Sequence, residues 1–154
     1  MNRWLSSAAV TLAAVAMIGV AQPAAAAPPD SVGGSFDVAG ICPFTVLVEI
    51  EGKAKTIERP DGSFILTSPG LVATVTNTST DASETWSISG SFHQSTLPNG
   101  DTFTKMTGRN LVTDPVAGFA LISGDFSFTA APDGSIVVPL NGTGRIVDVC
   151  EVLG

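Results

Sequence analysis

The sequence predicts an all-β protein, built as an antiparallel meander of about eight strands. Apolar and polar residues alternate along most of the chain after residue 34, which is the pattern of strands with one buried face. Turn sequences of the form Pro-Asp-Gly or Pro-Asn-Gly recur at 60–62, 98–100 and 132–134. After residue 27, no stretch of the sequence has the spacing of an amphipathic helix.

Residues 1–26 have the features of a secretory signal peptide. Arg3 gives the start of this segment a positive charge, and Leu5–Val20 is mostly apolar. Ala24 and Ala26 place small residues at the two positions that a signal peptidase reads. We expect cleavage after Ala26 and release of a secreted chain that has no further membrane anchor.

The mature chain is predicted to form a single β domain at 35–154, preceded by a flexible leader at 27–34 that holds two prolines and two glycines. Short connections join nearly all of the strands, so neighbours in the chain are expected to pair antiparallel. The predicted strands are 35–40, 44–58, 63–67, 71–77, 84–94, 102–113, 118–131 and 135–149.

The turn sequences explain where these strands end. In each Pro-Asp-Gly or Pro-Asn-Gly, proline fixes φ, Asp or Asn bonds its own backbone, and glycine takes the left-handed conformation, so each predicts a hairpin. Ser68-Pro69-Gly70 and Asp114-Pro115 are interpreted as further reversals. The resulting architecture is an up-and-down barrel or, alternatively, a two-sheet sandwich.

Cys42 and Cys150 are the two cysteines, and in an oxidising compartment such a pair is most simply one disulfide. The strand count leaves their placement open. With one long strand at 44–58, a simple meander sends the two cysteines to opposite ends of the domain. A turn at Gly52 instead gives an even count and brings them to one end.

Composition excludes several kinds of partner and chemistry. The net charge is −7, with 14 acidic residues against 7 basic ones, which argues against nucleic-acid binding. Two cysteines without a C-x-x-C motif and a single distant histidine make a poor ligand set, so no metal and no cofactor are expected. The chain is expected to be a monomer with no membrane contact after cleavage.

His93 is the one histidine, and a Ser-His-Asp arrangement would need it as the base. The sequence has no G-x-S-x-G motif around a candidate serine, so we expect no enzymatic activity. A small extracellular hydrolase that uses His93 is the alternative.

Arg109 and Arg145 each follow a Thr-Gly pair inside a strand-like run, where glycine often marks a bulge that redirects the next side chain. Asp125 and Asp148 are their expected partners, either in bridges that fix strand register or in a polar cluster that lines a pocket. Trp86 is the one tryptophan after residue 26, and it is interpreted as a core anchor or, second, as a platform for a ligand.

Several segments together resemble a group of short secreted bacterial proteins to which no activity is assigned. The resemblance spans roughly residues 40–150 and implies secretion and a Cys42–Cys150 bond, but no catalytic residue. The segments that carry it are Cys42-Pro43-Phe44, Val46-x-Val48-Glu49, Gly52-Lys53, Ser68-Pro69-Gly70-Leu71, Thr107-Gly108-Arg109-Asn110-Leu111, Gly142-Thr143-Gly144-Arg145 and Asp148-x-Cys150.

These observations predict a secreted, non-catalytic β domain that binds a small apolar ligand or acts at the cell surface. In a barrel, the ligand pocket is expected inside, lined from the face that carries Trp86, Phe126 and Phe128. In a sandwich, that face is a filled core, and loops 77–83 and 95–101 are the expected binding surface. A protein-binding inhibitor or toxin-like module is a further alternative.

Overall fold

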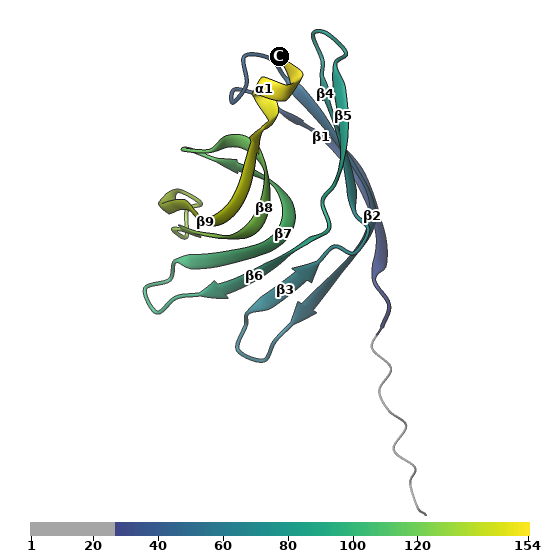
Figure 1. Ribbon diagram of the computed structural model, residues 1–154. Coiled ribbons are helices and arrows are strands. Elements are labelled where there is room, and N and C mark those ends of the chain that lie inside the picture. The colour runs from purple at the N-terminus through teal and green to yellow at the C-terminus, as the bar shows by residue number, and fades with distance from the viewer. Residues whose placement is uncertain (1–26) are drawn as a thin grey trace, which may run out of the picture.

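The computed structural model describes residues 27–154, which form nine β-strands and one short helix (Figure 1). The predicted signal peptide at 1–26 lies outside the described residues. The elements are β1 (Asp30–Val38), β2 (Val46–Glu58), β3 (Phe64–Thr67), β4 (Val72–Asn77), β5 (Ser83–Ser87), β6 (Gly90–Thr96), β7 (Thr102–Asp114), β8 (Gly118–Ala130), β9 (Ile136–Asp148) and α1 (Val149–Leu153).

All nine strands belong to one antiparallel sheet, ordered β5-β4-β2-β3-β6-β7-β8-β9, with β1 on the free side of β2. The predicted all-β class is confirmed. The structure does not support the predicted barrel, because within the described residues β1 pairs with β2 alone, β9 pairs with β8 alone, and the sheet stays open. One continuous sheet therefore supplies both layers of the domain, in contrast to the two separate sheets of the alternative sandwich.

The strand count also differs from the prediction at Ser68-Pro69-Gly70, which does not reverse the chain. Both β3 and β4 run antiparallel to β2, so they form one pass that is interrupted at 68–71. The predicted strand 84–94 is likewise interrupted at 88–89, where β5 ends and β6 begins. Hydrogen bonds from Ser68 N to Gly90 O (3.1 Å) and from Ile88 N to Leu71 O (2.9 Å) continue across the two interruptions.

These two interrupted passes explain why the two cysteines lie at the same end of the sheet. β2 is a single strand without a turn at Gly52, and six passes of the chain follow Cys42, made by β2, β3 with β4, β5 with β6, β7, β8 and β9. Six is an even number, so Cys42 and Cys150 reach the same end of the sheet, where they form the predicted disulfide with a Cα–Cα distance of 5.3 Å.

β1 begins at Asp30, five residues before the strand predicted to begin at residue 35. Residues 30–34, which were predicted to belong to a flexible leader, pair with residues 50–54 of β2. The strand is exposed along its length except at Val38. Its backbone pairing with β2, and not a buried face, holds it in the sheet, which is why the alternation of side chains does not reveal it.

A row of glycines crosses β6, β7, β8 and β9, and the last three of these strands curve strongly (Figure 1). Gly90, Gly108, Gly124 and Gly144 lie directly opposite one another on β6, β7, β8 and β9. Gly124 has φ +149°, and a Cβ placed there would lie 2.2 Å from the backbone oxygen of Thr143. We call these four residues the glycine row, because the absence of side chains allows the strands to bend tightly there.

The predicted bulges at Gly108 and Gly144 do not occur at these positions. The register between β7 and β8 runs without a shift from Thr102 to Asp114, and the irregular pairing of β8 with β9 lies at 127–130. The two glycines take unusual φ values, +78° and +149°, because they lie in the glycine row and not because an extra residue is inserted.

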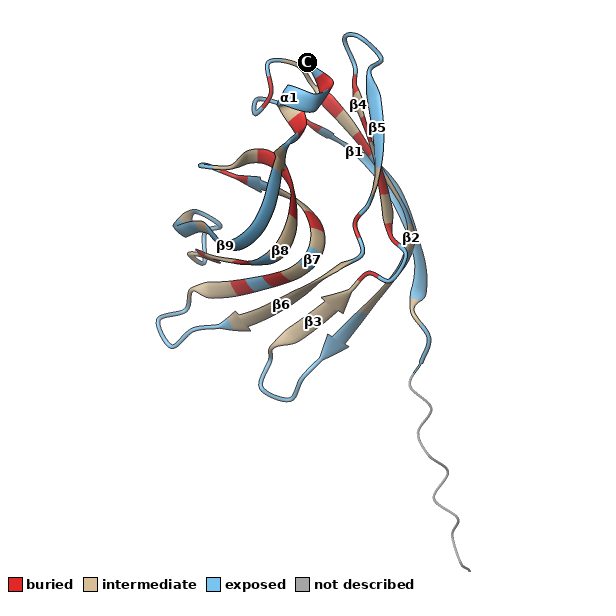
Figure 2. Cartoon of the chain, viewed as in Figure 1, coloured by how far each residue is buried: buried red, intermediate tan, exposed pale blue. Residues whose placement is uncertain are grey.

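The apolar core lies on both sides of the β7–β9 layer, and the strands coloured as buried face one another across it (Figure 2). Between β1, β2 and β4 on one side and β8 and α1 on the other lies a cluster that includes Val48, Val75 and Phe119. A second cluster, with Met106 and Phe126, packs inside the bend of β6–β9. The core therefore lies on both faces of β7 and β8.

The three predicted hairpin turns are confirmed and have the same hydrogen bonds. The first residue of each connection donates its backbone N–H to the fifth, and the glycine donates back to the first. The hydroxyl and backbone N–H of Ser63 lower the pKa of Asp61, and Ser135 lowers the pKa of Asp133 in the same way. The connections are 59–63, 97–101 and 131–135.

The helix α1 is absent from the sequence prediction, which continues the last strand to residue 149. A helix of five residues is too short to show a periodic pattern, but its N-cap signal, Asp148 followed three residues later by Glu151, is present in the sequence. The backbone oxygen of Leu153 accepts a hydrogen bond from Asn77 Nδ2 (3.1 Å), so α1 is bound to the end of β4 as well as to Cys42.

Asp114 connects the β7–β8 turn to β9 with its buried carboxylate. Oδ1 accepts from the backbone N–H groups of Val116 (2.8 Å) and Ala117 (3.0 Å), and Oδ2 accepts from Leu140 N (2.9 Å). Burial raises the pKa of Asp114, but these three hydrogen bonds lower it by more, so the pKa lies below its ordinary value. The charged carboxylate therefore stabilises this end of the sheet.

We expect Asp114→Asn to lower the free energy of unfolding by about 1–3 kcal/mol, because the amide NH₂ leaves the half-buried N–H of Leu140 without an acceptor. Urea unfolding at neutral pH measures this loss. Since folding lowers the pKa of Asp114, its contribution is present above the ordinary value and is lost as the pH falls through the folded-state value. The variant should therefore lose less stability in acid than the wild type.

Asp37→Asn on the exposed face of β1 is the matched control, and it should leave both the free energy of unfolding and its acid dependence unchanged. Equal losses of stability in the two variants would contradict the assigned role of Asp114.

Candidate functional site

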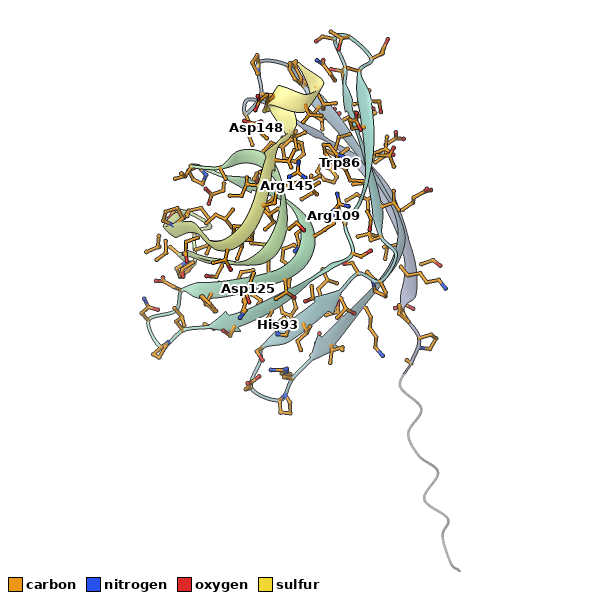
Figure 3. The ribbon with its side chains drawn as sticks, in the orientation of Figure 1. Trp86, His93, Arg109, Asp125, Arg145 and Asp148 are labelled. Atoms are coloured by element: carbon orange, nitrogen blue, oxygen red, sulfur yellow. A yellow bond between two sulfur atoms is a disulfide. The ribbon has the colours of Figure 1, made fainter. Side chains whose placement is uncertain are left out.

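Three of the predicted polar residues share one face of β7, β8 and β9 (Figure 3). Arg109 lies directly opposite Ser123, which lies directly opposite Arg145. Asp125 follows Ser123 by two residues and is on the same face. Its carboxylate forms an ion pair with Lys105 Nζ at 3.0 Å, and this is the one ion pair within residues 27–154. The predicted Arg–Asp bridges are therefore absent from the described part of the chain.

Asp148 does not join this cluster, contrary to the prediction. It is the N-cap of α1, and its Oδ1 accepts from the backbone N–H groups of Cys150 (2.8 Å) and Glu151 (3.2 Å). An Asp at this position satisfies the free N–H groups of the first helical turn, so its role is to fix the helix that carries Cys150.

His93 lies on β6, half-buried, between Ile65 of β3 and Lys105 of β7. Neither neighbour completes a Ser-His-Asp arrangement. Trp86 lies on β5 opposite Ala73. Like Ile50 and Leu111, it packs against two of the buried clusters. This packing agrees with the interpretation of Trp86 as a core anchor.

Phe126 and Phe128 do not form the predicted pocket with Trp86. They belong to the cluster inside the bend of β6–β9, where Phe126 is 3% exposed and Phe128 packs beside it. Trp86 packs against the other face of the β7–β9 layer. On β8, Phe126 and Phe128 share the face of Ala120 and Ile122, whereas Trp86 packs against the cluster that holds Leu121, on the opposite face.

The structure has an apolar cavity of about 330 Å³ in a different place, between β1, β2 and the last part of β7. Ligand pockets typically have volumes of about 300–1,000 Å³, so the cavity is large enough for a small molecule. Its walls are mainly apolar. The lining residues are Phe36, Val38, Ile50, Leu66, Ser68, Leu71, Ile88, Phe92, Asn110, Leu111, Val112, Thr113 and Phe119.

The interruption of the sheet at 88–89 explains why this cavity exists. β6 pairs with β7 as far as Gly108, whereas β5 turns away and pairs with β4. The following residues of β7, 109–114, therefore have no strand on that side. Four consecutive residues, 110–113, line the cavity, as expected when a strand presents an open edge to it.

The cavity has few polar groups, and some of them already form hydrogen bonds within the protein. Asn110 is buried, and its Nδ2 donates to Thr107 O at 3.1 Å. Ser68 is buried, and its backbone N–H donates to Gly90 O. Ser68, Asn110 and Thr113 are thus the polar residues of an otherwise apolar lining, and the side-chain oxygen of Asn110 and the hydroxyl of Ser68 are two hydrogen-bonding groups that they bring to it.

Phe36, Leu66 and Phe92 were not predicted from the sequence as cavity residues. The available signal was the pair of chain interruptions, because Ser68-Pro69-Gly70 and Ser89-Gly90 place strand breakers where two neighbouring passes meet. Ser123 was likewise not predicted as a site residue. The recurrence of Thr-Gly-Arg at 107–109 and 143–145 pointed to that position, because the antiparallel β8 lies between the two copies.

Within residues 27–154, no group of three or more His, Cys, Asp or Glu side chains is arranged to hold a metal ion. The one helix found there, α1, is too short to cross a membrane. No protein-family model, curated protein or solved structure matches the chain.

Proposed function

We propose that the protein is a secreted, non-catalytic binding protein that holds a small apolar molecule in the cavity between β1, β2 and β7. The observation that supports this proposal is the cavity itself, which has a volume of about 330 Å³ and mainly apolar walls. Secretion is supported by the signal-peptide features of residues 1–26 and by the Cys42–Cys150 disulfide, a bond typical of oxidising compartments.

The lining of the cavity favours an aliphatic ligand with one uncharged polar group. Phe36, Leu66 and Phe92 give apolar contact area, and no charged side chain is among the lining residues. A hydroxyl group matches the two polar atoms of Ser68 and Asn110, because it both donates and accepts a hydrogen bond. A carboxylate, in contrast, would lose its hydration without gaining a cation.

We expect octanol to bind the protein and to raise its melting temperature as the ligand concentration increases. A ligand that binds only the folded state adds about 2.7 kcal/mol at a hundredfold excess over Kd. Leu66→Trp fills the cavity from β3 and should abolish this stabilisation, whereas octanoate should have little effect on the wild type. Thermal unfolding with increasing ligand measures both effects.

Ile65→Trp is the matched control, because Ile65 is the neighbouring residue of β3 and is absent from the cavity lining. It should bind octanol like the wild type. If Leu66→Trp fails to fold, Phe92→Ala gives a second test, since enlarging the cavity should shift the preference towards longer alcohols. The proposal fails if no alcohol stabilises the wild type, or if Leu66→Trp binds octanol as tightly as Ile65→Trp.

A further inference from the structure

A second pocket, of about 250 Å³, lies on the β7–β9 face that carries Arg109 and Arg145. The two arginines are separated by Ser123, and Leu121 and Val147 of the next cross-strand row form its apolar wall. It shares no lining residue with the cavity of the proposed function, so the two sites are independent. Figure 3 shows both arginines on the side of the β7–β9 layer that faces Trp86.

Neither arginine has an acidic partner within residues 27–154, where the one ion pair joins Lys105 to Asp125. Asp125 is the acidic residue of β8 on this face, and its carboxylate is already engaged by that pair. Asp148, the other acid predicted to pair with them, caps α1. The chain has 14 acidic and only 7 basic residues. Two arginines that share one pocket without an acidic partner therefore stand out in this molecule.

The geometry fits an oxyanion. Neighbouring strands lie about 4.8 Å apart, so the Cα atoms of Arg109 and Arg145 are about 10 Å apart across β8. Two long side chains that start at this separation can converge on one group, and each guanidinium offers two parallel donors to oxygen atoms. The hydroxyl of Ser123 lies between them as a third donor.

We propose that Arg109, Ser123 and Arg145 bind a doubly charged oxyanion, a sulfate or a phosphate group. Two guanidinium charges balance two negative charges, whereas a carboxylate would leave one cation uncompensated. Arg109 is half-buried and Arg145 is exposed, so the apolar wall of Leu121 and Val147 reduces solvent screening mainly at Arg109 and strengthens the attraction there.

The test is a titration with sodium sulfate and with inorganic phosphate, followed by the backbone amide NMR signals of Arg109, Ser123 and Arg145. Sodium chloride and sodium acetate at equal ionic strength are the reference salts. We expect saturable shifts with sulfate and phosphate. Arg109→Gln and Arg145→Gln should each weaken binding about tenfold or more, because each variant removes charge-assisted hydrogen bonds.

Arg59→Gln is the matched control, since Arg59 lies in the exposed β2–β3 turn, away from this pocket. It should bind sulfate like the wild type, and Arg109→Lys should bind with intermediate affinity because it keeps the charge and loses the paired donors. When the pH falls below the second pKa of inorganic phosphate, the anion becomes singly charged and should bind more weakly, whereas the binding of sulfate should not change.

Three results would overturn the proposal. The first is the absence of a saturable shift in the wild type with either anion. The second is an equal loss of affinity in Arg59→Gln and in the two site variants. The third is binding of acetate as tight as that of sulfate, which would show that the site does not select for a double charge.

Discussion

Replacing both cysteines, Cys42→Ala together with Cys150→Ala, is expected to lower the free energy of unfolding by about 4 kcal/mol. The disulfide joins residues separated by 108 positions, and loop-closure entropy gives about 4.7 kcal/mol for a loop of about 100 residues. Urea unfolding of the oxidised wild type and of the double variant measures the difference. The bond also links α1 to the loop before β2. When the bond is removed, the exchange of backbone amide hydrogens should therefore increase first in α1.

Reduction of the wild type separates the effect of the bond from the loss of the side chains. Cys42 is buried, so alanine also removes core contacts there. A reducing agent should bring the wild type close to the double variant, and it should leave the double variant unchanged. A loss of less than about 1 kcal/mol on reduction would contradict the loop-closure argument.

Gly124→Ala is expected to destabilise the fold by about 4 kcal/mol or to prevent folding. The residue has φ +149°, a conformation that is essentially restricted to glycine and costs other residues about 1–3 kcal/mol. The new Cβ would also lie 2.2 Å from Thr143 O and 2.8 Å from the Cα of Gly144, and relieving such overpacking costs about 1–3 kcal/mol more. Chemical denaturation, or the yield of folded protein, measures the effect.

Gly118→Ala on the same strand is the control that isolates the cost of the backbone conformation. Gly118 also has a positive φ, +68°, but a Cβ there would meet no atom within 4 Å. It should cost about 1–2 kcal/mol, the ordinary penalty of the left-handed region. If the two variants are equally stable, the tight packing at the glycine row contributes nothing, and the bend of the sheet has another cause.

The sequence was informative where the determinants of structure are local. Pro60-Asp61-Gly62 and its two relatives contain their own turn geometry, so the three hairpins follow from a few residues each. Alternation along 102–113 and 118–131 places β7 and β8 within about a residue of their observed bounds. The disulfide follows from the presence of two cysteines in a chain with signal-peptide features.

The predictions failed where structure depends on what a segment pairs with. Ser68-Pro69-Gly70 is suited to a reversal, yet pairing of both flanking strands with β2 keeps the chain in one direction. Residues 30–34 bury little and become a strand through backbone bonds to β2. Sheet closure requires the edges at β1 and β9 to meet, and nothing local in either strand indicates whether they do.

The candidate sites divide in the same way. Arg109, Asp125 and Arg145 lie on one face because side chains alternate along each strand. Odd-numbered residues of β7, β8 and β9 pair with one another, so they point to the same side. The choice of Lys105 as the partner of Asp125 does not follow, since it depends on side-chain reach across the strands. The apolar cavity arises from a pairing that is missing between β5 and β7, and a sequence pattern reports only the pairings that form.

The order of pairing along the chain has a consequence for how the domain matures. Each pass of the sheet bonds to the pass that follows it in the chain, so each hairpin can form as soon as its second strand is synthesised. Cys150 follows the ninth strand, whereas Cys42 precedes the second. The native disulfide can therefore form only after all nine strands have been synthesised. We expect it to form last and to stabilise a sheet that is already assembled.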